Sequence, residues 1–129
     1  MVKRNVTYVN FDNVEVTDAL YFNLTEAELL DIELRYGGDV SKQLELLKDR
    51  KDIKGQFDIV KDIIVTGYGE KNADGRFIKN RDIRDSFVAT GAFSQLLVDL
   101  LSNENALADF LRAMAPNGLR IAAEPEKEA

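Results

Sequence analysis

The chain has 129 residues, of which 45% are apolar, and this is enough for one compact domain that buries about two-thirds of its unfolded surface. It contains no cysteine and no histidine, which excludes disulfides, thiolate metal sites and the side chain that most often serves as general base or transition-metal ligand. The net charge of −6 argues against a general nucleic-acid binder, because phosphate recognition needs a basic surface.

Charge is unevenly distributed along the chain. Between Asp12 and Glu33 there are seven acids and no base, whereas between Glu70 and Asp85 five bases outnumber four acids. Either each region is a solvated face, or the two regions dock on each other or on a partner of opposite sign. No apolar run approaches the roughly 20 residues of a membrane span, and the first ten residues contain no apolar signal segment. We therefore expect a cytosolic protein without a membrane partner.

Residues 2–24 are predicted to form a β-hairpin. In the second arm, alternate residues from Val14 to Leu24 are apolar and would share one face, interrupted by Asp18. Asp12-Asn13 stands where a two-residue turn would join the arms, since both residue types tolerate a positive φ. A lone hairpin is marginally stable in water, so we expect this one to pack on the rest of the chain.

Residues 25–116 are predicted to hold five or six helices. The first begins with a capping box, in which Thr25 caps the first turn and Glu28 lies three residues further on. Gly37 is placed to end that helix in a left-handed conformation. A second, short helix is expected around Ser41–Arg50.

A longer helix is predicted from about Asp52 to Gly67 or Gly69. Its apolar row at the helical spacing is Ile53, Phe57, Val60 and Ile64. The four phenylalanines on the apolar rows of the helices are expected in the core: Phe57, Phe87, Phe93 and Phe110. Another helical segment begins near Arg81 and has a break or bend at Thr90-Gly91.

The last helix is expected to be capped by Ser102 or Asn103 and to end before Pro116, which cannot continue it. Residues 1–118 are therefore predicted to form a single α+β domain that is mainly helical, with the hairpin followed by a bundle. The polar residues 119–129 are expected to be a flexible tail.

The segment Glu70–Arg81, EKNADGRFIKNR, begins like the calcium loop of an EF-hand. Asn72, Asp74 and Gly75 fit the third, fifth and sixth positions of such a loop, but Arg81 stands at the twelfth, where a bidentate carboxylate is required. The neighbouring glycines fit neither the Walker nor the dinucleotide-binding spacing. We therefore predict a turn between two elements, with no metal or cofactor site.

No group of residues in the sequence favours a reaction. Ser86 and Ser94 lie on helical segments, and without histidine nothing activates them as nucleophiles. The paired carboxylates and the lysines all have a simple interpretation as solvated surface. We predict that the protein is not an enzyme and has no catalytic residue.

The helices between Phe87 and Met114 carry more large apolar residues than one face of a small bundle needs. Leu96–Val98 and Leu100-Leu101 point in several directions around one helix axis. Such a helix is either central in the fold or paired with another chain. We therefore predict a homo-oligomer and a partner-binding surface on these helices. The candidate residues for that surface are Phe93, Leu97, Leu101, Phe110 and Met114.

The order of the segments resembles that of the small tail assembly chaperones of long-tailed bacteriophages of Gram-positive hosts. The segments that carry the resemblance are VTYVNFDNVEVTDALYFNLTEAEL, YGEKNADGRFIKNRDIRDSF and ATGAFSQLLVDLLSNENALADFLRAM. The likeness covers about residues 5–116, although Arg35–Asp62 matches only in helical character.

This resemblance implies a non-enzymatic protein that binds the phage tape-measure protein and keeps its aggregation-prone helices soluble. It also implies that the protein helps the tail-tube protein to polymerise, acts in the cytoplasm of the infected or lysogenic host and is absent from the mature virion. The polar ending favours the short form of such chaperones over a frameshift-extended form. The alternative is a minor structural tail or head–tail connector protein that is retained in the virion.

Overall fold

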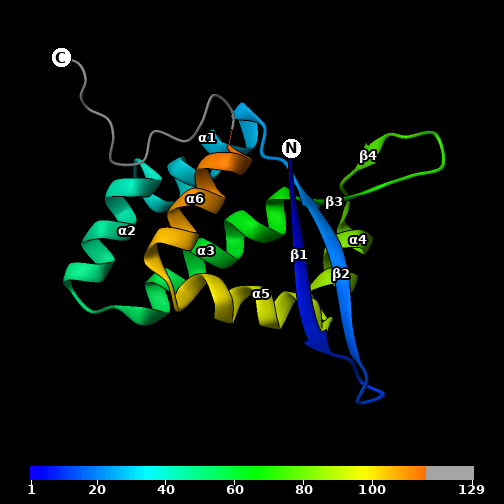
Figure 1. Cartoon of the computed structure of the whole chain (residues 1–129). Coiled ribbons are helices and arrows are strands. Elements are labelled where there is room, and N and C mark those ends of the chain that lie inside the picture. The colour runs from blue at the N-terminus through cyan, green and yellow to red at the C-terminus, as the bar shows by residue number, and fades with distance from the viewer. Residues whose placement is uncertain (116–129) are drawn as a thin grey trace.

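The computed structural model describes residues 1–115 of the chain. Within them the chain forms four strands and six helices (Figure 1), which confirms the predicted hairpin followed by a mainly helical body. The elements are β1 (Val2–Val9), β2 (Glu15–Phe22), α1 (Glu26–Tyr36), α2 (Val40–Asp49), α3 (Ile53–Gly67), β3 (Tyr68–Lys71), β4 (Phe77–Ile78), α4 (Arg81–Val88), α5 (Gly91–Leu101) and α6 (Glu104–Met114). The expected domain end at residue 118 and the expected tail at 119–129 lie outside the described residues.

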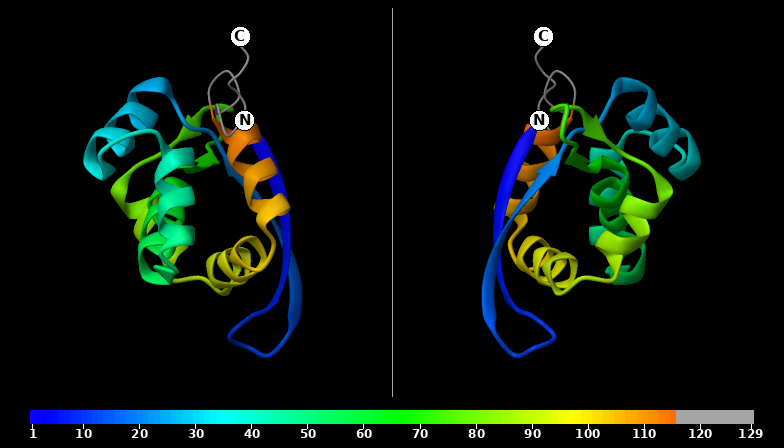
Figure 2. Two further views of the ribbon diagram at one scale, coloured as in Figure 1. Left: turned by 90° about the vertical axis from the view of Figure 1, so that its left-hand side faces the viewer. Right: turned by 90° about the vertical axis from the view of Figure 1, so that its right-hand side faces the viewer.

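The strands form one antiparallel sheet in the order β1-β2-β3-β4. Strands β1 and β2 pair along their whole length and lie against α5 and α6, while the tip of their hairpin extends beyond the helical body (Figure 2). The prediction that the hairpin packs on the helices is thus confirmed.

Strand β3 was not predicted. Helix α3 ends at Gly67, as the sequence indicated, but the next residue already pairs with β2, where Tyr68 lies opposite Phe22 and Gly69 opposite Tyr21. Because α3 ends directly beside the edge of the hairpin, the chain can continue there as a third strand. This pairing depends on the tertiary fold, and no local sequence pattern predicts it.

The loop between β1 and β2 corrects the predicted two-residue turn at Asp12-Asn13. The Asn10 N–H donates to the Val14 carbonyl at 2.9 Å, so three residues lie between the closing pair. The Asn13 N–H donates to the Asn10 carbonyl at 3.0 Å, and Asn13 has a φ of 63°. Three-residue loops with a left-handed last position are among the most common hairpin loops after the two-residue ones, and asparagine tolerates that position.

The helix boundaries follow the local signals in the sequence. Thr25 and Glu28 form the expected capping box, and Gly37 ends α1 with a φ of 87°. The expected break is confirmed, because Thr90 caps α5 and thereby separates it from α4. Asn103 caps α6, as one of the two expected candidates.

The core is built around the ring of Phe22, which is fully buried. Its ring centroid lies 5.1 Å from that of Phe110 and 5.7 Å from that of Tyr68, both in edge-on geometry. Tyr68 in turn stacks on Phe87 at 3.8 Å. These rings come from β2, β3, α4 and α6, so one aromatic cluster joins the hairpin to the helices.

Candidate functional site

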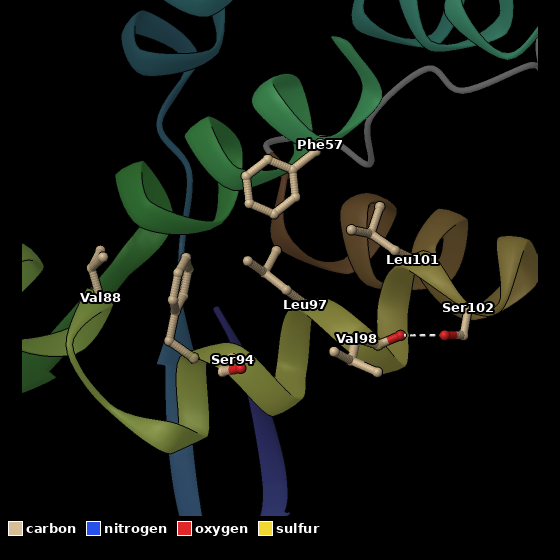
Figure 3. A pocket seen from close by; sticks show the side chains of 8 residues that line it. Phe57, Val88, Ser94, Leu97, Val98, Leu101 and Ser102 are labelled. Carbon is tan, nitrogen blue, oxygen red and sulfur yellow. Dashed lines mark hydrogen bonds between the residues drawn. The ribbon is translucent and has the colours of Figure 1, made fainter. Parts of the chain in front are cut away.

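An apolar groove runs between α3 and α5 (Figure 3). It consists of two adjoining hollows of about 540 and 460 Å³, which share Phe57 and Leu101 as lining residues. The groove is referred to below as the α3–α5 groove. Its principal apolar lining residues are Ile53, Phe57, Phe93, Leu97, Val98 and Leu101.

Helix α5 contributes one wall of the groove because it is apolar on nearly all sides. Thr90 fixes its start by accepting a hydrogen bond from the Phe93 N–H at 3.1 Å. Leu96 and Leu100 are then turned fully into the core. Val98 and Leu101 lie on the other side of the helix and remain 56% and 39% exposed.

Helix α3 contributes the opposite wall. Asp52 caps it by accepting from the Gly55 N–H at 2.9 Å, which places Ile53 in the first turn with 76% of its surface exposed. Phe57 follows one turn later, and its ring lies across the groove from Leu97 (Figure 3). The expected core residue Phe57 is partly buried and packs against the edge of the core, whereas Ile53 on the same apolar row is exposed.

Ser102 in the groove and Lys54 beside it already have hydrogen-bond partners within the chain. The Ser102 hydroxyl donates to the Val98 carbonyl at 2.6 Å (Figure 3). The Lys54 ammonium donates to Asp58 at 2.9 Å, and this hydrogen bond raises the pKa of Lys54, so the ammonium stays charged. The lining of the groove is therefore suited to contact with apolar side chains.

The five candidate residues from the sequence fall into two groups. Phe93, Leu97 and Leu101 line the α3–α5 groove. Phe93 and Leu97 are themselves core residues, each 6% exposed, so Leu101 is the one of the three with an appreciable exposed surface. Phe110 and Met114, 4% and 1% exposed, lie in the core and do not line the groove. Phe110 packs against Phe22 of the hairpin and Met114 lies beside Gly67 at the end of α3, so both side chains are buried.

The β3–β4 loop confirms the predicted turn within EKNADGRFIKNR. The Asn72 side-chain oxygen accepts from the backbone N–H groups of Asp74 and Arg76, at 2.9 and 3.0 Å. The turn thus uses the oxygen that a calcium loop would direct at its ion. Between residues 1 and 115 no three or more acidic side chains are placed to share a metal ion.

A charged cluster around Glu28 joins three elements inside the fold. Lys79 donates to the Glu28 carboxylate and, at 2.8 Å, to the Asn23 carbonyl. Arg84 donates to the Thr66 carbonyl at 3.0 Å and lies 3.4 Å from the same carboxylate. These interactions connect the start of α1 with the end of α3 and with α4. We therefore infer that the cluster stabilises the fold.

In the part of the chain that the structure describes, none of the helices combines the length and the hydropathy needed to cross a bilayer.

A family model described as phage tail assembly chaperone matches residues 1–129, which is the entire chain. No curated protein and no solved structure matches significantly.

Proposed function

This chain belongs to a family of phage tail assembly chaperones, and from that premise we propose that it binds the tape-measure protein and assists assembly of the tail tube around it. In this proposal the protein is not an enzyme, and its function is to bind apolar helical segments of the tape-measure protein reversibly. It acts in the cytoplasm of the bacterial host and leaves before the virion is complete.

The observation that carries this proposal is the α3–α5 groove. An amphipathic helix is recognised by laying its apolar face into such a groove, with anchors spaced one helical turn apart. The exposed Ile53, Val98 and Leu101 are apolar side chains that monomeric proteins usually cover, and together they mark an interaction surface.

The mainly apolar lining of the groove suits a chaperone that binds a long partner protein at many places. Because Ser102 and Lys54 are already hydrogen-bonded, a bound helix gains mainly apolar contact. Apolar contact discriminates weakly between sequences, so the same groove can bind many segments of one protein. The net charge of −6 would keep the loaded chaperone from associating nonspecifically.

Co-expression with the tape-measure protein and affinity capture test the proposal. Val98→Asp and Leu101→Asp place a carboxylate in the groove at positions that are already partly exposed, so the fold should survive. We expect each variant to keep its circular dichroism spectrum and to lose capture of the tape-measure protein. Leu34→Asp is the matched control, since Leu34 is 73% exposed on α1, away from the groove.

Two results would contradict the proposal. Capture of the tape-measure protein by the groove variants at the wild-type level would show that the groove is not the binding site. Mass spectrometry of purified virions that found the protein in abundance would favour a structural tail or head–tail connector protein instead.

A further inference from the structure

We propose that two copies of this chain pair antiparallel along the outer edge of β1, so that their sheets join into one continuous sheet. The occupant of the edge is the β1 strand of a second copy, and the dimer is symmetric. None of the residues that line the α3–α5 groove belongs to β1. The inference therefore goes beyond the proposed function and does not depend on it.

The outer edge of β1 has no partner strand within the described residues. β1 is the first strand in the order of the sheet, and it runs along the outside of the molecule (Figures 1 and 2). All eight of its residues pair with β2 in an unbroken register, and none of them is a proline. A long and regular edge of this kind presents N–H and C=O groups that a further strand can satisfy.

The hydrogen bonds of the hairpin show which backbone groups face outward. The Asn10 N–H donates to the Val14 carbonyl, which makes these two residues a hydrogen-bonded pair. Such pairs alternate along an antiparallel ladder, so every second residue of β1 turns its N–H and C=O groups toward β2. The residues between them turn these groups outward, and their side chains are exposed: Lys3, Asn5, Thr7 and Val9.

One antiparallel register satisfies all four outward-facing residues at once. In this register the two-fold axis passes between the Val6 residues of the two copies. Asn5 then lies opposite Thr7 of the second copy, and Lys3 lies opposite Val9. A shift of the register by two residues in either direction carries an outward-facing residue past the end of the other strand, which spans Val2–Val9. The strand is therefore complementary to itself about one axis.

The same register keeps like charges apart. β1 carries two bases, Lys3 and Arg4, and no acid, so a register that placed either base opposite itself would be repulsive. Here Lys3 lies opposite the apolar Val9. Arg4 lies opposite Tyr8 of the second copy, whose hydroxyl donates to the Asp18 carboxylate. The guanidinium would thus approach an aromatic ring and a carboxylate, both of which attract a cation.

Helix α6 would lie on the same side of the joined sheet in both copies. In each copy α6 contacts one face of β1, where the Arg4 guanidinium lies 5.9 Å from the centroid of the Phe110 ring. Residues that lie opposite each other in an antiparallel pair share a face of the sheet. The dimer can therefore bury helix surface as well as strand edge, which favours a stable interface, since the contact between two strands alone is small.

Sedimentation equilibrium of the full chain over a range of concentrations tests the inference. Each copy contributes the same edge, so the contact is isologous, and the wild type should form a dimer and nothing larger. The double variant Asn5→Lys, Thr7→Lys places like charges opposite each other across the axis. It should weaken dimerisation by about tenfold or more. Both positions are exposed, so the circular dichroism spectrum should stay that of the wild type.

The matched control is the double variant Thr17→Lys, Ala19→Lys. These positions lie opposite Thr7 and Asn5 in β2, and they are exposed as well. The control therefore adds the same charge to the same face of the sheet, but one strand away from the proposed contact. It should dimerise nearly as well as the wild type.

Mixing variants of opposite charge gives the decisive result. The double variant Asn5→Glu, Thr7→Glu should dimerise weakly by itself. An equimolar mixture with the lysine variant should form a dimer of one copy of each, because every introduced lysine then lies opposite an introduced glutamate. Four results would each overturn the inference: a wild type that stays monomeric, a wild type that grows beyond a dimer, a lysine variant that dimerises as well as the control, or a mixture that associates no better than its components.

Discussion

Asn10 and Asn72 hold the two hairpin loops of this chain with the same four hydrogen bonds. In each loop the asparagine side chain accepts from the N–H groups two and four residues later, and two backbone bonds close the turn. The residue three positions later is left-handed in both, with φ of 63° at Asn13 and 81° at Gly75. The shared pattern Asn-x-Asp-Asn/Gly thus encodes a three-residue loop, and it explains why NADG resembles the start of a calcium loop.

Replacing Asn72 by alanine should destabilise the fold. The substitution leaves two backbone N–H groups without their side-chain acceptor, although water can reach them in this exposed loop. We expect a loss of about 1 kcal/mol in the free energy of unfolding, measured by urea denaturation. Asn72→Asp keeps an acceptor oxygen and should recover most of the loss. If the alanine and aspartate variants lose the same amount, the side-chain oxygen is not what stabilises the loop.

Gly75 provides a test of the left-handed position alone. A Cβ atom at Gly75 would meet nothing within 4 Å, so Gly75→Ala changes only the backbone preference. We expect it to cost about 1–2 kcal/mol of stability. Gly75→Asn should cost less than Gly75→Ala, because asparagine occupies the equivalent position at Asn13 in the other loop. Equal losses for the two variants, measured by urea denaturation, would contradict this explanation.

The features that the sequence predicted well are those with a local signal. Thr25 and Glu28 cap α1 because both partners of the capping box lie within four residues of each other. The break at Thr90-Gly91 was visible for the same reason, since Thr90 is a good cap and its hydroxyl accepts from the first turn of α5.

The features that the sequence missed depend on contacts between distant segments. Helical periodicity placed Ile53 and Phe110 on apolar rows, but it could not show which row another element would cover. The hairpin covers Phe110 through contact with Phe22, whereas in the described structure Ile53 remains open to solvent. Of the five candidate surface residues, Leu101 is therefore the one that stays appreciably exposed, and Phe110 and Met114 do not reach the groove at all.

Phe110 and Leu101 should consequently respond in opposite ways to truncation. Phe110→Ala removes a buried ring from the aromatic cluster and should cost about 3–5 kcal/mol of stability. Leu101→Ala removes a side chain that is 39% exposed at the groove, and it should cost about 1 kcal/mol or less. Thermal or urea unfolding of both variants checks the difference. A large loss for Leu101→Ala with a small loss for Phe110→Ala would reverse the assignment of core and groove.

Glu28 should make the stability of the fold depend on acid pH. Burial tends to raise the pKa of its carboxyl group, but the hydrogen bonds from Lys79 and from the Thr25 N–H outweigh this and lower the pKa below its ordinary 4.5. A carboxyl group with a lowered pKa stabilises the folded state fully above the pKa of the unfolded chain. That stabilisation is lost as the pH falls from about 4.5 through the lower folded value.

The measurement is the free energy of unfolding between pH 7 and pH 3 for the wild type and for Glu28→Gln. At pH 7 the variant should be less stable, because Lys79 and Arg84 lose their carboxylate partner. The wild type should then lose more stability than the variant as the pH falls, since glutamine does not titrate. Glu26→Gln, at an exposed position of the same first turn, should leave the pH dependence close to that of the wild type. Parallel curves for the wild type and Glu28→Gln would show that the carboxylate of Glu28 is not responsible for the acid sensitivity.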